Sequence, residues 1–184
     1  MEHIYIRQIL DGDVSKYSHV IDLYKDMAYS IAFRILNNNE DAEEAVQDSF
    51  LRAYNALSSF KAESKFSTWL YKIVVNTSIN KSKGRRQIVN DINIDDLTEN
   101  ILAADVEPVL QKLIQQDRVK FINLALDKLM MEDRLLLTLY YLNENSIAEI
   151  SDITSIPKEN IKMKIHRARK KMFVVLNGIL INEM

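Results

Sequence analysis

Apolar residues recur at spacings of three and four along most of the chain, which is the period of an amphipathic α-helix. Over 40–57 such a helix has a small-and-apolar face, which consists of Ala42, Ala45, Val46, Ser49, Phe50, Ala53 and Leu57. A helix that begins near Phe66 has a stripe of Phe66, Leu70, Ile73 and Thr77. A third stripe consists of Ile161, Ile165, Ala168 and Met172. We predict that all three are buried.

The segment before the third stripe predicts a helix-turn-helix. Ser146 and Glu149 form an S-x-x-E capping box, in which each side chain binds a backbone N–H at the start of a helix. The first helix therefore begins at about Ile147, and a tight turn follows it. Pro157 fits the first turn of the second helix, because its fixed φ is helical and its missing N–H has no intrahelical partner there.

The second helix of the pair is strongly basic, with no acidic residue between Lys162 and Lys171. The side chains that point away from the apolar stripe are Lys158, Lys162, Met163, His166, Arg167 and Lys170. Those that flank it, where phosphates run beside a groove, are Lys164, Arg169 and Lys171. The pattern favours binding of duplex DNA. The alternatives are a solvated amphipathic helix, or a basic helix that lies on a membrane or binds calmodulin.

The composition is that of a folded helical protein. Its 184 residues are 47% hydrophobic and 27% charged, with three Gly and two Pro, so we predict an all-α fold. The lack of cysteine excludes disulfides and thiolate metal sites. His3, His19 and His166 lack metal-ligand spacing, and the glycines are too dispersed for a phosphate loop. We therefore expect no metal, no cofactor and no enzymatic activity.

Charge is unevenly distributed along the chain, although the net charge is −2. The stretches 61–86 and 158–171 are basic, with a single acidic residue each. From 87 to 111 Lys and Arg are absent and acidic residues accumulate. We therefore predict two small helical domains joined by an acidic flexible linker, with the helix-turn-helix in the second. The predicted ranges are 1–86 for the first domain, 87–107 for the linker and 108–184 for the second domain.

The helix that begins near Phe66 also has a polar face. Its members are Trp69, Lys72, Asn76, Asn80 and Lys83, followed by Arg85 and Arg86. An aromatic ring stacks on unpaired bases, amides bind base edges and cations bind phosphates, so this face suits single-stranded nucleic acid. The alternative is that Trp69 and Phe60, on the preceding loop, are core anchors.

The outward face of the helix over 40–57 is mixed in character. Its members are Glu44, Gln47, Asp48, Leu51, Arg52 and Asn55. A single leucine among polar side chains is compatible with a plain solvent surface and with a docking surface for a partner.

Taken together, 42–86 and 129–172 resemble the second and fourth regions of the bacterial extracytoplasmic-function sigma factors. The order of the two segments around an acidic linker makes this resemblance specific. It implies a protein that binds core RNA polymerase, directs it to promoters and opens the DNA. The resemblance also implies that the linker threads through the polymerase, although a solvated tether is the alternative.

The resemblance implies roles for individual residues. Docking on the polymerase falls on the outward face of the helix over 40–57. A base flipped out of the downstream promoter element is held by Phe60 and Asn76, next to Lys61 and Ala62, where the family often has Arg-Gly. The residues implied to face the bases of the upstream element are Lys162, Met163, His166 and Arg167.

Two further expectations concern partners and location. The resemblance implies an anti-sigma factor, for which the apolar tail 173–181 is a candidate contact, unless that tail completes the core of the fourth region. No apolar run reaches the roughly 18 residues of a membrane span, so we expect no membrane insertion and a location in the bacterial cytoplasm.

The main alternative to a sigma factor is a helix-turn-helix regulator that binds duplex DNA as a dimer without docking on core polymerase. The role of the first 22 residues, predicted as a short helix, a turn at Gly12 and the start of another helix, is unassigned.

Overall fold

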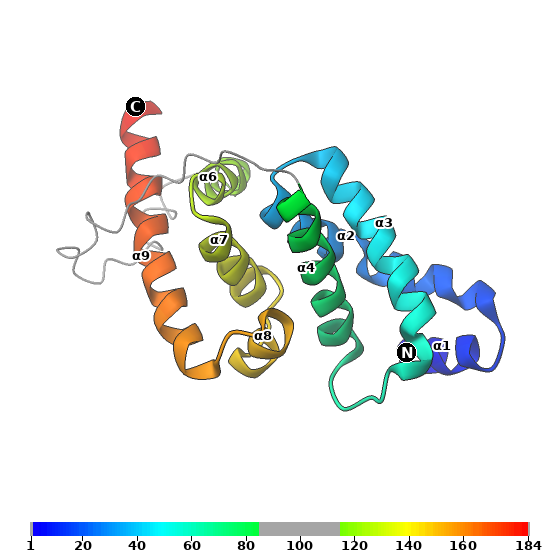
Figure 1. Ribbon diagram of the computed structural model, residues 1–184. Helices are drawn as coiled ribbons and strands as arrows, with labels where there is room; N and C mark the ends of the chain where they lie inside the picture. The colour runs from blue at the N-terminus through cyan, green and yellow to red at the C-terminus, as the bar shows by residue number, and fades with distance from the viewer. Residues whose placement is uncertain (1, 85–114, 184) are drawn as a thin grey trace.

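The computed structural model describes residues 2–84 and 115–183, and within these ranges the chain is helical, without a strand (Figure 1). The prediction of an all-α fold is confirmed. The predicted linker 87–107 lies outside the described residues, as do Arg85 and Arg86. Among the described helices, none is long and apolar enough to span a lipid bilayer.

The first half of the chain forms four α-helices, with single-turn helices η1 and η2 between them. Their bounds are α1 Glu2–Leu10, η1 Val14–Lys16, α2 Tyr17–Leu36, α3 Asn39–Ala56, η2 Leu57–Ser59 and α4 Phe66–Gly84. Gly12 has a φ of +106° and makes the predicted turn after α1, a conformation that glycine adopts readily. Asn37 ends α2 in the left-handed conformation, and the Asn38 side chain starts α3 by accepting the Asp41 N–H at 2.9 Å.

Helix α3 buries the face that its spacing predicts, from Ala42 to Ala53, and the buried Leu57 of η2 continues it. The helix is held against α2 by a hydrogen bond in which the Tyr17 hydroxyl donates to the Phe50 carbonyl at 2.6 Å. Burial raises the pKa of Tyr17 above its ordinary value, so this hydroxyl keeps its proton and remains a donor.

Helix α4 departs from its predicted stripe at one position. Phe66, Leu70 and Thr77 are buried as predicted, whereas Ile73 is half-buried and Val74 is fully buried in its place. The reason is that α4 packs against α2, α3 and α8 at once. Burial therefore extends around the helix beyond a single stripe and brings Val74 into the core.

The second half of the chain forms the predicted helix-turn-helix and the helices that support it. The bounds are α6 Gln115–Asp127, α7 Met131–Leu137, a π-helical turn η4 Thr138–Leu142, α8 Ile147–Thr154 and α9 Lys158–Glu183. The capping box is confirmed, because Ser146 Oγ accepts the Glu149 N–H at 3.2 Å and Glu149 accepts the Ser146 N–H at 2.8 Å. Pro157 precedes α9 by one residue instead of lying in its first turn, and its carbonyl accepts the Asn160 N–H at 3.0 Å.

Helix α9 continues without interruption through the apolar tail (Figure 1). Its predicted stripe, from Ile161 to Met172, is buried. Farther along, Leu176 is fully buried and Val175 and Ile179 pack against the core, whereas Ile181 is 74% exposed. The tail 173–181 therefore completes the core of the second half and leaves Ile181 in solvent.

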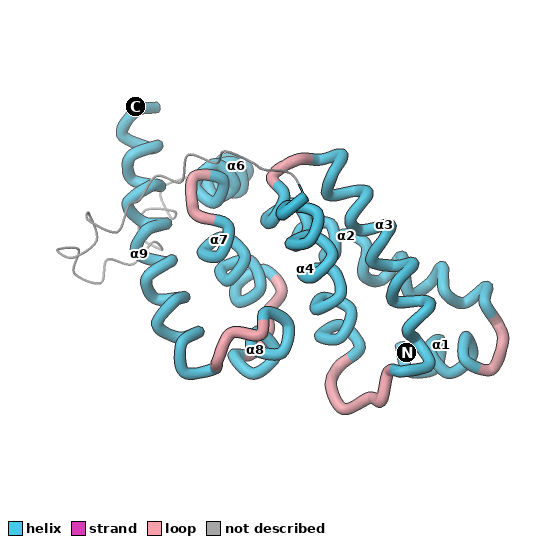
Figure 2. The backbone as a smooth tube through the Cα atoms, in the orientation of Figure 1, coloured by secondary structure: helices cyan, strands magenta, loops and turns pink. Residues whose placement is uncertain are grey.

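The two halves of the described chain pack against each other. Helix α4 contacts α8, and α2 contacts both α7 and η4, so the buried residues form one continuous apolar cluster. Figure 2 shows that short loops connect most of the helices, and that a longer loop leads into α4. This arrangement determines which helix faces remain available to partners.

Candidate nucleic-acid interface

The polar face predicted on α4 is exposed to solvent. Lys72, Asn76, Asn80 and Lys83 are exposed, and Trp69 is half-buried. The other sides of α4 are covered by α2, α3 and α8. We call the set formed by these exposed residues and Trp69 the α4 face.

An aromatic cluster forms one end of the α4 face. The ring centroids of Phe60, Phe66 and Trp69 lie 5.3–5.4 Å apart. Phe66 is fully buried, whereas Phe60 and Trp69 are half-buried. The cluster therefore anchors the loop before α4, and it also leaves aromatic surface at the edge of this face.

The loop before α4 has one left-handed residue and one ion pair to α8. Ala62 has a φ of +55°, in the left-handed region that favours glycine, at the position next to the exposed Lys61. Lys65 Nζ lies 2.8 Å from Glu149 Oε1, in the first turn of α8. The hydrogen bond from Lys65 lowers the pKa of Glu149, so this carboxylate stays charged. The loop is thus tied to the helix-turn-helix.

The predicted outward face of α3 is also exposed, and we call it the docking face. Its members are Glu44, Gln47, Asp48, Leu51, Arg52 and Asn55. The Leu51 side chain is 64% exposed. Glu44 is engaged within the molecule, because Lys81 Nζ of α4 lies 2.7 Å from its carboxylate.

An apolar groove of about 520 Å³ adjoins the docking face. One wall comes from η1 and α2 and the other from α3; the lining residues are Val14, Tyr17, Ile21, Lys25, Val46, Gln47, Phe50, Leu51 and Tyr54. Sequence reasoning missed this groove, because its walls are distant in the chain. The spacing of Val14, Tyr17 and Ile21 was the available signal, since it places three apolar side chains on one side of a helical segment.

The α9 face predicted to read bases is exposed at its amino-terminal end. Lys158, Lys162, Met163, His166 and Arg167 are exposed and Lys170 is half-buried; we call this set the α9 face. Because the stripe from Ile161 to Met172 is packed into the core, the orientation of this face is fixed.

The flanking basic residues of α9 have partners within the molecule. Lys164 forms an ion pair with Glu132 of α7, and the Nη1 of Arg169 donates a hydrogen bond to the Tyr141 hydroxyl at 3.5 Å. Lys171 does not flank a groove as predicted. It is 8% exposed, and its ammonium lies 3.1 Å from the Asp133 carboxylate, so it is a structural residue of the core.

Two protein-family models match the chain, Sigma-70 region 2 over residues 20–88 and Sigma-70 region 4 over residues 122–172. The ECF RNA polymerase sigma factor SigW of Bacillus subtilis is 31% identical over 175 residues, which cover 91% of this chain and 92% of SigW. The chain belongs to the ECF RNA polymerase sigma factors. It is an alternative sigma factor, which directs RNA polymerase to promoters.

Other relatives of this sigma factor agree with the assignment. The ECF sigma-E factor of Escherichia coli K12 is 26% identical over 175 residues, or 92% of this chain and 91% of that one. Among solved structures, CnrH in complex with the cytosolic domain of CnrY aligns with a TM-score of 0.65 at 19% identity, covering 95% of this chain and 96% of CnrH. RpoE of Bartonella quintana, in complex with the anti-sigma factor NepR, aligns with a TM-score of 0.62 at 19% identity, over 88% of this chain and 96% of RpoE. These structures share the fold.

The family regions of the sigma factor coincide with the surfaces described above. The region 2 match contains the docking face and the α4 face, and the region 4 match contains the α9 face. The groove extends beyond the region 2 match, because Val14 and Tyr17 precede residue 20. Within the described part of the chain, no three His, Asp or Glu side chains gather as a metal site requires.

The left-handed conformation at Ala62 predicts that this sigma factor is stabilised by Ala62→Gly. A left-handed φ costs a residue with a side chain roughly 1–2 kcal/mol, and glycine loses about 0.5–1 kcal/mol more backbone entropy on folding. We expect the free energy of unfolding in urea to rise by about 0.5–1 kcal/mol. The control Ala148→Gly, at an exposed helical position of α8, should lower it by about 1 kcal/mol. A loss of stability in both variants would contradict the prediction.

Proposed function

We propose that this sigma factor acts through three separate surfaces. The docking face and its groove bind core RNA polymerase, the α4 face captures unpaired promoter bases, and the α9 face reads the upstream duplex. The observation that carries the proposal is that α3, α4 and α9 each bury an apolar stripe and present these side chains outward. The chain itself performs no chemistry in this scheme, and polymerase catalyses RNA synthesis. The proposed domains are region 2 over 1–86, a linker over 87–107 and region 4 over 108–184.

The docking face combines an apolar centre with polar surroundings. Leu51 stands exposed at the edge of the apolar groove, with Gln47, Asp48 and Arg52 beside it. Interfaces between proteins have this composition, with an apolar core that excludes water and a polar rim that sets orientation. The surface therefore suits a partner that inserts apolar side chains into the groove.

Leu51→Ala should weaken binding to core RNA polymerase by about 1–2 kcal/mol, because truncation of a central apolar contact removes buried area. Leu23, which is 57% exposed on α2 outside the groove lining, provides the matched control Leu23→Ala. The measurement is a titration of labelled sigma factor with core polymerase, supported by co-elution in gel filtration. Equal affinities of the two variants would refute the docking assignment. A wild-type chain that does not bind core polymerase but binds duplex DNA as a dimer would support the alternative of a helix-turn-helix regulator.

Binding of unpaired bases to the α4 face can offset the free-energy cost of opening the duplex. Separating base pairs costs about 1.4 kcal/mol per stacking step, whereas one base stacked on an aromatic side chain gains roughly 1–3 kcal/mol. Phe60 and Trp69 offer aromatic surface, and Asn76 is exposed on the same side of α4. Lys72 and Lys83 suit the phosphates of the captured strand. Lys61, exposed on the loop, and the residues Asn80, Arg85 and Arg86 belong to the same proposed site.

Asn76→Ala should reduce the yield of open promoter complexes about tenfold, in line with the 1–3 kcal/mol of a good amide–base contact. Binding of the variant to core polymerase should be unchanged, because Asn76 is not a member of the docking face. Permanganate reactivity of unpaired thymines measures opening, and the titration described above measures binding. Equal open-complex yields for variant and wild type would contradict a role in base capture.

The α9 face has the chemistry of a recognition helix in a major groove. Lys162, His166 and Arg167 are donors for base edges, and Met163, which is 54% exposed, suits apolar contact with a thymine methyl group. Lys158 and Lys170 suit phosphates, as do Lys164 and Arg169, which their internal partners already orient.

Arg167→Ala and Lys170→Ala should separate base reading from phosphate binding. Arg167→Ala should reduce the free energy of binding to the cognate upstream element by about 1–3 kcal/mol, and it should have little effect on binding to scrambled duplex. Lys170→Ala should weaken binding to both duplexes alike. Because one phosphate contact is lost, the slope of log affinity against log salt should fall in magnitude by about one. The measurement is a salt titration of holoenzyme binding on both duplexes. Equal losses on cognate and scrambled DNA for Arg167→Ala would remove the base-reading assignment.

We also propose that an anti-sigma factor regulates this chain. The support is that CnrH and RpoE, which share its fold, are each seen with a bound partner, the cytosolic domain of CnrY and the anti-sigma factor NepR. The proposed site of action is the bacterial cytoplasm, where polymerase and promoter DNA are found.

A further inference from the structure

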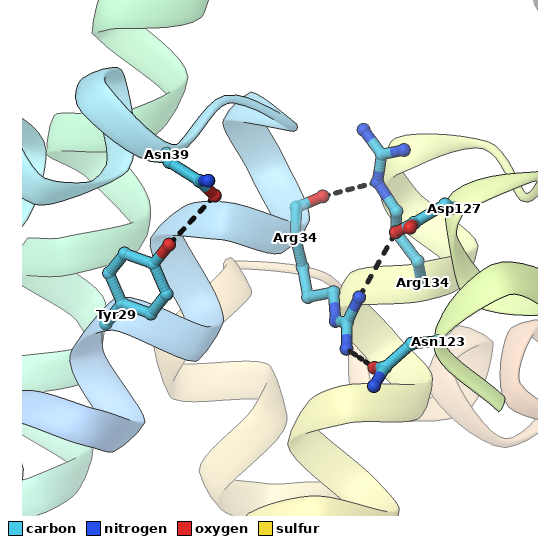
Figure 3. A network of polar contacts seen from close by, with 6 residues as sticks. All are labelled: Tyr29, Arg34, Asn39, Asn123, Asp127 and Arg134. Carbon is cyan, nitrogen blue, oxygen red and sulfur yellow. Dashed lines mark hydrogen bonds and ion pairs between the residues drawn. The ribbon is translucent and has the colours of Figure 1, made fainter. Parts of the chain in front are cut away.

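One group of charged and polar contacts between the helices is buried and serves packing. Arg34, near the end of α2, is buried, and its Nη1 lies 3.2 Å from the Asp127 carboxylate of α6. Its other terminal nitrogen donates to the Asn123 side chain, and the Arg134 side chain of α7 donates to the Arg34 backbone carbonyl (Figure 3). None of these residues belongs to a proposed binding surface, so the network holds α2 to α6 and α7.

A second group of charges lies at the docking face. Lys81 of α4 reaches α3, where its Nζ lies 2.7 Å from Glu44 Oε2 and 3.6 Å from the Asp41 carboxylate. The Lys81 side chain is 23% exposed, whereas the Glu44 side chain is 65% exposed. The hydrogen bond to Glu44 raises the pKa of Lys81, so the ammonium stays charged. A largely covered cation therefore holds one oxygen of an exposed carboxylate.

The segment of α3 that Lys81 contacts is itself held in place. The Asn38 side chain caps the helix by accepting the Asp41 N–H. The Tyr29 hydroxyl of α2 donates to the Asn39 side chain at 3.0 Å, so the first turn of α3 is also tied to α2 (Figure 3). Helix α4 packs directly against α3. Lys81 therefore extends from one fixed helix to another.

Folding stability is a weak reason for this contact. An ion pair with an exposed partner adds little to stability, because water screens the charges and two long side chains lose freedom. What the ion pair changes is the freedom of Glu44. An unrestrained glutamate on a helix surface samples several rotamers, and a partner that engages it has to select one, which weakens binding. Lys81 restricts the carboxylate before the partner arrives.

We propose that Lys81 is a positioning residue of the docking face, which holds the Glu44 carboxylate in the orientation that core RNA polymerase engages. Lys81 occupies Oε2, so Oε1 can accept from a second donor. A cationic side chain of polymerase fits this oxygen, because charge-assisted hydrogen bonds to a carboxylate are strong. The role of Lys81 rests on the proposed docking of α3 on polymerase, and it deepens that role by naming the chemistry of the polymerase surface opposite Glu44.

The test measures the affinity of full-length variants for core polymerase by titration. Lys81→Met removes the ammonium and keeps most of the aliphatic stem, and Lys81→Arg restores a charged donor. Glu44→Ala removes the group through which Lys81 acts, and the double variant completes a thermodynamic cycle. The control is Lys128→Met, which makes the same change of net charge at an exposed position after α6. Salt at about 0.3 M screens the long-range effect of that charge change.

We expect Lys81→Met to bind core polymerase about fivefold more weakly, in line with the freedom that one long side chain loses on binding. Lys81→Arg and Lys128→Met should stay within about twofold of the wild type. In the Glu44→Ala background, Lys81→Met should have no further effect, because its target is gone. Unfolding of Lys81→Met in urea should match that of Lys128→Met, which a purely structural role of Lys81 would not allow.

Equal core affinities of Lys81→Met and Lys128→Met would overturn the positioning role, as would the same loss with and without Glu44. A clear drop in folding stability would overturn it too, in favour of a structural role. If Lys81→Met does not fold by circular dichroism, Lys81→Gln takes its place in the cycle. The docking face is judged separately: it stands if Leu51→Ala weakens binding while Lys81→Met does not, and it falls if Leu51→Ala and Glu44→Ala both bind like the wild type.

Discussion

The proposed binding surfaces of this sigma factor depend on one constraint, which is that α3, α4 and α9 each bury a largely apolar side. Once the stripe from Ala42 to Leu57 is packed, the side chains that α3 offers to a partner are determined by the 100° turn per residue. The same reasoning applies to α4 and α9. Helix α4 is the most constrained, since three neighbouring helices leave it a single open side.

The same constraint explains why solved relatives at 19% identity share the fold. A buried stripe requires apolar side chains of compatible volume, and many sequences provide them. The outward side chains are free of this requirement, so they can vary with the promoters and partners of each member. In this chain they include Lys61-Ala62 at the loop before α4, where the family often has Arg-Gly.

Sequence patterns were sufficient where the determinant was local. The capping box of Ser146 and Glu149, the turn at Gly12 and the buried face of α3 each depend on residues a few positions apart, and each is present. The patterns failed where the determinant was distant. Lys171 was assigned to a phosphate-facing flank because a helical projection cannot show Asp133, which reaches it from α7. The apolar groove and the Arg34 contacts were missed for the same reason, because their partners come from helices far apart in the chain.

The uninterrupted course of α9 has a mechanical consequence. Its 26 residues form one rod of roughly 39 Å at 1.5 Å per residue, with the α9 face toward one end and the solvent-exposed Ile181 near the other. Because the buried positions from Ile161 to Leu176 hold this rod along most of its length, its two ends keep a fixed distance and direction relative to each other. A partner that covers Ile181 therefore contacts the same rigid element that presents Lys162, roughly 29 Å away along the helix axis.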